Sequence, residues 1–263
     1  MNGEPALAVS AQDRGLQYGD GVFESLVCRG GRPLWLDRHL ARLRRGLDVL
    51  GIAAPAAAEL DESVRRAAAC EPGMGIVKLI VTRGPATARG YRAQGDERAT
   101  TIVSRHPYAP PPAALRVALS AVRLGHNRLL AGIKHLNRLE QVLAQRQLSP
   151  DCDEVIMLDE AGRAICGSMS NLFLARGDAL VTPRLERCGI AGVMRTLVFE
   201  AARAQAIPVE EADVGLDELQ AAGALALCNV RLGLTPVIRF EGRALGIDPR
   251  FTAIRRWIDA HAA

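Results

Sequence analysis

One lysine stands where its amine could act as a nucleophile. Lys134 lies just before a stretch with helical periodicity. Asn137 is a good N-cap and Glu140 follows three residues later, the spacing of a capping box, so we expect a helix from Asn137 to about Leu148. Apolar residues on one face of this helix would be buried and would fix the loop that carries the lysine. They are Leu136, Leu139, Val142 and Leu143.

A lysine held against a core in this way would be desolvated. Desolvation lowers the pKa of an amine, and a neutral amine attacks aldehydes. A solvated lysine beside an ordinary amphipathic helix has the same spacing. Because most lysines are solvated, spacing alone favours that second interpretation for Lys134.

A glycine-containing turn forms a second candidate site. The run 188–195, Cys-Gly-Ile-Ala-Gly-Val-Met-Arg, precedes a predicted helix that continues to about Gln205. Glycine at a helix start lets backbone N–H groups approach an anion, and the positive end of the helix favours phosphate. A single G-x-x-G more often marks a plain turn. Gly192, with the amides of Val193 and Met194, is therefore a candidate phosphate site, and a plain turn is the alternative.

Two charged residues fall in otherwise apolar elements. Residues 22–27 are expected to form a strand, and alternation puts Glu24 on the face opposite Phe23. A glutamate there lies either at a sheet edge or in a polar site, and the residues alone favour the edge. A helix that opens at Leu36, with Asp37 as N-cap, carries Arg42 off its apolar stripe. The default interpretation of Arg42 is a solvated side chain.

The surrounding elements indicate an α+β protein in two parts. The first half is expected to hold a further helix at 60–69 and strands at 76–82 and 100–104. The second half is expected to begin with a strand at 115–119 and, after the lysine segment, to hold short strands joined by hairpins at 154–158, 164–166, 171–175 and 180–182. Residues 225–237 are expected to form a strand, a polar turn and another strand. Residues 106–112, His-Pro-Tyr-Ala-Pro-Pro-Pro, are the clearest linker. We therefore predict an N-terminal α/β domain at 1–108, a Pro-rich linker at 109–114 and a C-terminal domain at 115–263.

Composition describes a globular protein. Of the 263 residues, 49% are hydrophobic and 24% are charged, with a net charge of +4 and no block of Lys or Arg. We expect no nucleic-acid partner, whereas small acidic substrates are compatible with this charge. The six cysteines form no C-x-x-C and have no nearby histidine pair, so no metal site is expected. Without a leader or an apolar run of about 18 residues, a cytoplasmic protein with no membrane partner is expected.

The lysine segment resembles that of a known enzyme family. The run 134–143, Lys-His-Leu-Asn-Arg-Leu-Glu-Gln-Val-Leu, and the upstream run 120–125, Ser-Ala-Val-Arg-Leu-Gly, are similar to the fold-type IV (class IV aminotransferase-like) pyridoxal phosphate enzymes. Within the family they are most similar to the lyases of 4-amino-4-deoxychorismate. The resemblance covers nearly the whole chain. It implies a D-amino acid aminotransferase-like fold, with a smaller N-terminal α/β domain and a larger barrel-like domain that binds pyridoxal 5'-phosphate. It also implies a homodimer and a Schiff base between Lys134 and the cofactor.

Further motifs assign roles by the same resemblance. Residues 14–23 are similar to the first family motif, in which Phe23 and Glu24 would line the substrate side of the cofactor. The His-x-x-Arg-Leu pattern at 39–43 makes Arg42 resemble the arginine that clamps the cofactor phosphate, which suits a permanently charged fork of donors. The remaining implied cofactor contacts are Gly192, Val193, Met194, Asn229 and Val230. The implied partners of substrate carboxylates are Arg89, in the run Arg89-Gly90-Tyr91, and Arg231.

One position departs from the family pattern. In the family, a glutamate five residues before the asparagine of an Asn-(Leu/Val)-Phe motif keeps the pyridine nitrogen of the cofactor protonated. Counting back from Asn171, that position is Cys166. A thiol offers only a weak hydrogen bond to a neutral nitrogen. Losing the protonated nitrogen weakens the stabilisation of a carbanion, which transamination needs more than elimination does.

The resemblance implies a carbon–oxygen lyase that converts 4-amino-4-deoxychorismate to 4-aminobenzoate and pyruvate in folate biosynthesis. Elimination suits Cys166 because electrons leave with the departing group and the product ring is aromatic. A D-amino acid or branched-chain aminotransferase of the same fold is one alternative. A non-catalytic relative is another; Cys166 counts for it and Lys134 against it.

Overall fold

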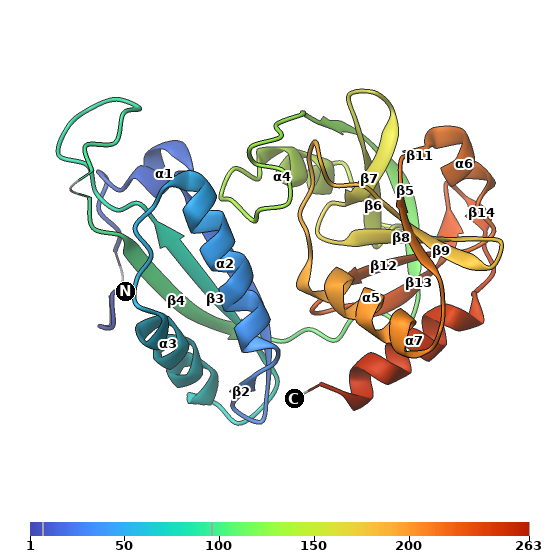
Figure 1. The fold of residues 1–263 in the computed structure, drawn as a ribbon, viewed down its shortest axis with the longest axis horizontal. Coiled ribbons are helices and arrows are strands. Elements are labelled where there is room, and N and C mark those ends of the chain that lie inside the picture. The colour runs from blue at the N-terminus through green and yellow to red at the C-terminus, as the bar shows by residue number, and fades with distance from the viewer. Residues whose placement is uncertain (7, 96, 263) are drawn as a thin grey trace. The chain divides into compact units, whose positions relative to one another are not determined.

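The structure, a computed structural model, describes residues 1–6, 8–95 and 97–262, and its chain divides into two compact units (Figure 1). The first unit comprises Met1–Ala109 together with Ile133–Asn137. The second comprises Pro110–Gly132 and the chain from Arg138 onward. The five residues around Lys134 therefore pack with the first unit, although the residues that flank them in sequence pack with the second.

The first unit is an antiparallel sheet with helices on one face (Figure 1). Its strands follow the order β2-β1-β3-β4. They are β1 (Gly21–Arg29), β2 (Arg32–Pro33), β3 (Gly75–Thr82) and β4 (Thr100–Pro107). Its helices are α1 (Arg14–Tyr18), α2 (Leu36–Leu50) and α3 (Ala57–Ala69). Strand β4 continues to Pro107, so His106 and Pro107, the first residues of the Pro-rich run 106–112, are strand residues.

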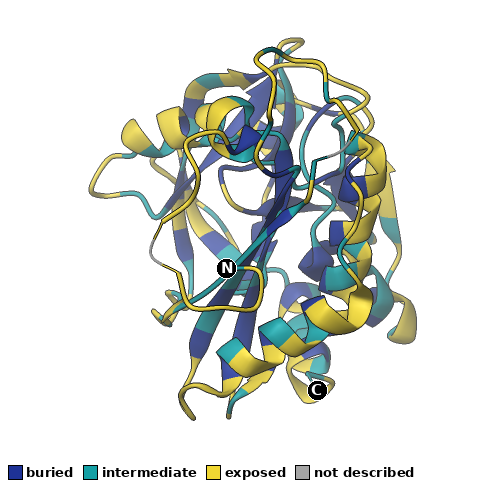
Figure 2. Cartoon of the chain, turned by 90° about the vertical axis from the view of Figure 1, so that its left-hand side faces the viewer, coloured by how far each residue is buried: buried dark blue, intermediate teal, exposed yellow. Residues whose placement is uncertain are grey.

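Alternation along β1 and β3 separates the two faces of this sheet. The helix side holds a buried core that includes Leu26, Leu43 and Leu79. The opposite face, which carries Phe23 and Lys78, is only half-buried, as the mixed colours of the strands in Figure 2 show. A side chain on β1 is therefore either fully buried against α2 or placed on the more open face.

Both predicted N-caps are wrong. Helix α2 begins after Trp35, and no side chain caps it, so Asp37 lies inside its first turn. Helix α4 (Leu139–Arg146) begins after Arg138, also without a side-chain cap. The Asn137 amide instead donates to the Gly19 carbonyl at 3.2 Å. The Asn137 side chain therefore makes a tertiary hydrogen bond in place of the helix cap that its local spacing predicted.

The predicted buried face of α4 is also wrong. Leu139 and Val142 are 68% and 59% exposed, and Leu143 is exposed as well. Ala144 is the buried residue of this helix. The lysine loop must therefore be held in place by contacts other than this apolar stripe.

The second unit is built on a 10-stranded sheet in the described part of the chain. The strand order is β10-β9-β8-β12-β13-β5-β6-β7-β11, and an extra pairing of β7 with β8 gives the sheet its barrel-like curvature. Its strands are β5 (Leu115–Leu124), β6 (Glu154–Asp159), β7 (Arg163–Gly167), β8 (Asn171–Arg176), β9 (Ala179–Pro183), β10 (Val209–Ala212), β11 (Val214–Gly215), β12 (Leu225–Asn229), β13 (Gly233–Phe240) and β14 (Arg243–Ala244). The predicted hairpin strands of this half are confirmed.

Helices pack around this sheet. Besides α4 they are α5 (Val193–Ala204), α6 (Leu216–Ala221) and α7 (Pro249–Ala260), and α5 and α7 lie side by side in Figure 1. The core between strands is almost wholly aliphatic, with Ile156, Leu172 and Leu227 fully buried. Among the described helices, none has the length and apolar character that crossing a membrane requires.

Candidate active site

The lysine segment is fixed by backbone pairing with the edge of β1. The Phe23 N–H donates to the Lys134 carbonyl at 3.0 Å, and the Leu136 N–H donates to the Gly21 carbonyl at 2.9 Å. This pairing puts Lys134 opposite Phe23, and its Nζ lies 4.2 Å from the centre of the Phe23 ring. A cation over an aromatic face is attracted to it. The structure therefore brings together Lys134 and Phe23, two of the residues expected in the site.

The neighbouring residue, Glu24, points to the other face of the sheet. Its carboxylate is fully buried, and it accepts hydrogen bonds from Arg42 Nε at 2.7 Å and Arg42 Nη2 at 2.5 Å. His39 Nδ1 lies 2.6 Å from the same carboxylate. The prediction of a sheet-edge Glu24 is wrong, because both partners come from α2, which covers this face. Glu24 orients Arg42, and only Phe23 lies on the side of Lys134.

The electrostatics of this cluster follow from its burial. Burial alone would raise the pKa of Glu24, but the charge and hydrogen bonds of Arg42, helped by His39, outweigh it and lower that pKa to about 2. Burial lowers the pKa of His39, and the positive charges of Arg42 and Lys134 act in the same direction. Glu24 is therefore ionised and His39 neutral at pH 7.

His39 was missed by the sequence analysis, although it belongs to the quoted His-x-x-Arg-Leu pattern. Because Glu24 is a carboxylate, His39 Nδ1 must carry the proton that joins them. That leaves Nε2 as an acceptor, and it is buried without a hydrogen-bond partner among the described residues. The triad of Glu24, His39 and Arg42 thus has a fixed proton arrangement.

In the second unit, the start of α5 has the properties of an anion site. Gly192 is the N-cap, and no side chain caps this helix. A Cβ on Gly192 would lie 2.2 Å from Asn171 Oδ1, so only glycine allows this close packing. Asn171 is held in turn, because its Nδ2 donates to the Ile190 carbonyl at 2.8 Å. The N–H groups of Val193 and Met194, in the first turn, have no acceptor within the helix and can meet an anion.

Asn171 also joins the other predicted residues of this unit. It pairs with Cys166 across β7 and β8, and with Cys228 across β8 and β12. Asn229 follows directly, and its Nδ2 donates to the Met169 carbonyl at 3.1 Å. Strand pairing therefore places Cys166 on one side of Asn171 and the turn that begins at Asn229 on the other.

The turn after β12 is ordered by Asn229. Its Oδ1 accepts the N–H groups of Arg231 at 2.9 Å and Leu232 at 2.8 Å. Arg231 lines a small pocket of this unit. The other residues of the pocket are Pro112, Leu115, Asp153, Glu154, Met169, Asn229 and Leu232.

The thiol of Cys166 is buried in an apolar cluster. Its neighbours in the cluster include Cys188, Val155 and Met157. Burial raises the pKa of Cys166 to about 12, and the negative charge of Glu154 acts in the same direction. The group at position 166 is therefore a neutral S–H at pH 7.

Glu154 was also not predicted as a site residue. It is the buried carboxylate that orders the turn after β7. Glu154 Oε1 accepts the backbone N–H and the hydroxyl of Ser168, and the Gln145 amide donates to it at 3.1 Å. In the sequence, Glu154 could have been noticed as a glutamate that directly precedes the apolar run of β6. Glu154 holds the loop between Cys166 and Asn171.

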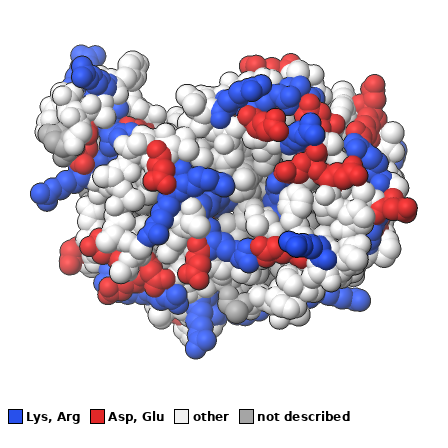
Figure 3. All heavy atoms as spheres, viewed as in Figure 1, with Lys and Arg blue, Asp and Glu red and all other residues white. Residues whose placement is uncertain are grey.

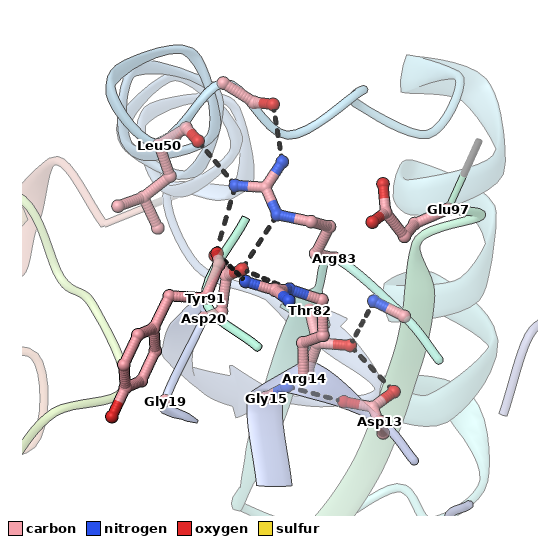
Figure 4. Close-up of polar contacts among 12 residues, drawn as sticks. Asp13, Arg14, Gly15, Gly19, Asp20, Leu50, Thr82, Arg83, Tyr91 and Glu97 are labelled. Carbon is pink, nitrogen blue, oxygen red and sulfur yellow. Dashed lines mark hydrogen bonds and ion pairs between the residues drawn. The ribbon is translucent and has the colours of Figure 1, made fainter. Parts of the chain in front are cut away.

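The two arginines expected to meet substrate carboxylates belong to different units. Arg89 is exposed on a loop of the first unit, and Arg231 is half-buried in the second. In Figure 4 the carbonyl of Tyr91, close to Arg89 in sequence, faces the side chain of Arg14. Arg14 and its partner Asp20 lie in the quoted first motif, but their contact with this loop has no sequence signal.

Comparison with known proteins identifies the family. Residues 21–240 match amino-transferase class IV. The chain belongs to this family. A curated relative, the aminodeoxychorismate lyase of Vibrio harveyi, is 32% identical over 243 residues, which cover 90% of this chain and 89% of the relative. A putative branched-chain-amino-acid aminotransferase of Methanocaldococcus jannaschii is 28% identical, covering 90% of this chain and 84% of the relative.

Solved structures of class IV aminotransferase relatives match the fold. The 4-amino-4-deoxychorismate lyase of Pseudomonas aeruginosa has a TM-score of 0.93 and 39% identity, covering 98% of this chain and 97% of the other. The branched-chain aminotransferase of Thermoproteus uzoniensis has a TM-score of 0.85 and 25% identity, covering 95% and 87%. The predicted α+β fold of fold-type IV is confirmed.

The surface agrees with a small-molecule enzyme of the class IV aminotransferase family. Lys and Arg are interspersed with Asp and Glu over the face shown in Figure 3, without a continuous basic patch there. Within the described residues, no group of three or more His, Cys, Asp and Glu could hold a metal ion.

Proposed function

We propose that the chain is a pyridoxal phosphate-dependent lyase that converts 4-amino-4-deoxychorismate to 4-aminobenzoate and pyruvate, a step of folate biosynthesis. The observation that carries this proposal is the likeness to two lyases over nearly the whole chain. Identity is 39% to the Pseudomonas enzyme and 32% to the Vibrio enzyme. Both values exceed the 25–28% found for the two branched-chain relatives described above.

Each unit by itself offers groups that suit pyridoxal 5'-phosphate. Gly192, with the N–H groups of Val193 and Met194, offers a helix start for the phosphate, where a Cβ would not fit. Arg42, oriented by Glu24, offers a permanent positive charge, and we propose that Asn229 and Val230 complete the phosphate site. Bound pyridoxal phosphate supplies an aldehyde that links to an amine and a ring that withdraws electrons from the adjacent carbon.

Lys134 has two roles in this proposal. Its amine would hold the cofactor before turnover and would be released when the substrate amine binds. The freed Nζ would then take the proton from the amine-bearing carbon of the substrate, and the electron pair of that C–H bond would form the ring double bond as the enolpyruvyl C–O bond breaks. The proton would pass to the departing enolpyruvate, which gives pyruvate and an aromatic ring. Phe23, 4.2 Å from Nζ, limits where the amine can move.

Cys166 favours elimination over transamination. Its neutral S–H, with a pKa of about 12, offers the cofactor ring no negative charge. At this position the family has a carboxylate that holds the proton of the ring nitrogen, and a thiol could not do so, so carbanion stabilisation would be weaker. Elimination tolerates this because the electrons depart with the enolpyruvyl group. Arg89 and Arg231 are proposed to meet the substrate carboxylates, since guanidinium groups bind carboxylates in a two-point geometry.

We propose that the active protein is a cytoplasmic homodimer. The exposed apolar side chains of the second unit support a protein interface. They include Leu129, Leu139, Val142, Leu143 and Met169. All six cysteines are free, which suits a reducing compartment.

The test is turnover of aminodeoxychorismate by the purified protein, with and without a 2-oxo acid as amino acceptor. The proposal expects the same rate of 4-aminobenzoate formation in both, because elimination consumes no acceptor. A rate that depends on the acceptor, with an amino acid as product, would instead identify an aminotransferase. A bound cofactor with no turnover of either kind would indicate a non-catalytic relative.

A further inference from the structure

Arg14 makes a set of contacts that the proposed reaction does not explain. Its side chain is 4% exposed, and all three kinds of guanidinium nitrogen are used (Figure 4). Nε donates to Asp20 Oδ2 at 2.9 Å, Nη1 to the Gly90 carbonyl at 3.0 Å, and Nη2 to the Tyr91 carbonyl at 2.7 Å. A planar fork can make these bonds at once, whereas a lysine ammonium cannot reproduce the geometry.

The two carbonyls belong to the loop that carries Arg89, residues 84–95, here called the Arg89 loop. Its base is held by backbone bonds, from Arg14 N–H to the Gly84 carbonyl and from Ala86 N–H to the Gln12 carbonyl. Further along, Arg14 donates the only hydrogen bonds that reach residues 87–93 from elsewhere in the described chain. The middle of the loop therefore depends on this one side chain.

An aromatic contact supports the same attachment. The Tyr91 ring lies edge-on to the Tyr18 ring, with centres 5.4 Å apart, and the Arg14 guanidinium lies 5.0 Å from the Tyr18 ring. Tyr91 is nevertheless 86% exposed. The ring pair buries little apolar area, so the hydrogen bonds of Arg14 are the stronger hold on the loop.

Asp20, the carboxylate partner of Arg14, lies in the turn that also contacts the lysine segment. Gly21 accepts the Leu136 N–H, and Gly19 accepts the Asn137 amide. One rigid turn within the first unit thus touches both the segment of Lys134 and, through Arg14, the Arg89 loop.

We infer that Arg14 is a positioning residue that holds the Arg89 loop in place and so determines how tightly a substrate carboxylate is recognised. This inference rests on the proposed function, in which Arg89 meets a carboxylate. An exposed arginine on an unattached loop would have to be ordered each time substrate binds, which weakens binding. Arg14 orders the loop beforehand and takes no part in the proton transfer at Lys134.

The test variant is Arg14→Lys, which keeps the charge beside Asp20 and loses the fork to the two carbonyls. Tryptic cleavage after Arg89 and Arg92 under native conditions should become about tenfold faster, because opening of the loop no longer has to break these bonds. The KM for aminodeoxychorismate should rise about tenfold, while kcat changes less than about twofold.

Arg83→Lys is the matched control. Arg83 Nε donates to the same Asp20 at 2.7 Å, but its other nitrogens donate to the carbonyls of Leu50 and Gly51, outside the Arg89 loop. This variant should leave cleavage after Arg89 and Arg92 and the KM within about twofold of the wild type. A double variant, Arg14→Lys with Arg89→Ala, should have the same KM as Arg89→Ala alone, because Arg14 acts through Arg89.

Each arm has an outcome that overturns the inference. Unchanged cleavage in Arg14→Lys shows that Arg14 does not hold the loop. Faster cleavage with an unchanged KM, or effects of Arg14→Lys and Arg89→Ala that add in the double variant, shows that it does not act through Arg89. If the wild type turns over no aminodeoxychorismate, the proposed function fails, and cleavage alone then decides whether Arg14 fixes the loop.

Discussion

The two units bring their candidate cofactor groups into place by opposite means. In the first unit, buried charged side chains are paired, as Glu24 is with Arg42 and His39. In the second unit, the groups are backbone amides and uncharged side chains, as at Gly192, Asn171 and Cys166. One region supplies charge and the other supplies close packing.

The difference predicts how each region fails. A buried charge is tolerated only while its partner remains, so neutralising one partner of the pair lowers the free energy of unfolding. A backbone anion site has no charge to lose, but it needs empty space beside Gly192, so adding one atom is costly. Substitutions that remove a buried charge should therefore destabilise the first unit. Substitutions that add a side-chain atom beside Gly192 should disturb the second.

The largest effect is expected from Glu24→Gln. The change leaves the Arg42 guanidinium buried without its carboxylate, and the free energy of unfolding should fall by about 3–5 kcal/mol in urea denaturation. The exposed Asp48→Asn, also on α2, should change it by less than about 0.5 kcal/mol. If both variants lose the same amount, buried pairing does not distinguish the first unit.

The pH dependence of stability should reveal the same pair. The folded pKa of Glu24, about 2, lies below its ordinary value of 4.5, so its contribution is complete above pH 4.5 and is lost as the pH falls towards 2. Urea denaturation between pH 7 and pH 2.5 should show a wild-type decline that is steeper than that of Glu24→Gln. Parallel curves for the two proteins would contradict the assigned ion pair.

Gly192→Ala should damage the second unit by addition. The new Cβ would lie 2.2 Å from Asn171 Oδ1, so the start of α5 must shift. The Kd for pyridoxal phosphate, measured by absorbance, should rise about tenfold. Gly215 is also a helix N-cap, with nothing within 4 Å of an added Cβ, and Gly215→Ala should leave that Kd unchanged. Equal Kd values in both variants would argue against the α5 site.

The smallest effect concerns the thiols. Cys166, with a pKa of about 12 and a buried side chain, should resist iodoacetamide at pH 8 in the folded protein. Cys70 is exposed and should react. Peptide mass spectrometry resolves the two positions. Alkylation of Cys166 as fast as Cys70 would mean that position 166 is open or charged.

Residue types carried most of what the sequence could predict. Glu24 stands out as a charge among apolar strand residues, and the turn at Gly192 stands out by its glycines. Lys134 and Arg42 were singled out by the family motifs, because spacing alone favoured solvated side chains. Strand positions followed from alternation and turn residues, because both patterns are local. The fold class followed from the family motifs.

Partners could not be predicted, because they come from distant parts of the chain. The contact between Asn137 and Gly19 overrode a good local helix cap, and the exposure of Leu139 reversed an apparent buried stripe. His39, Arg14 and Glu154 gave no decisive sequence signal, since their roles depend on which atoms they meet. The domain boundaries stay predictions, as do the cofactor and substrate contacts.

The most direct test of the account is product analysis with Lys134→Ala beside the wild type, using aminodeoxychorismate generated in place and no amino acceptor. The account predicts equal amounts of 4-aminobenzoate and pyruvate from the wild type and a rate at least about a thousandfold lower from the variant, since both amine roles are lost. Normal rates from Lys134→Ala, or products in unequal amounts from the wild type, would contradict it.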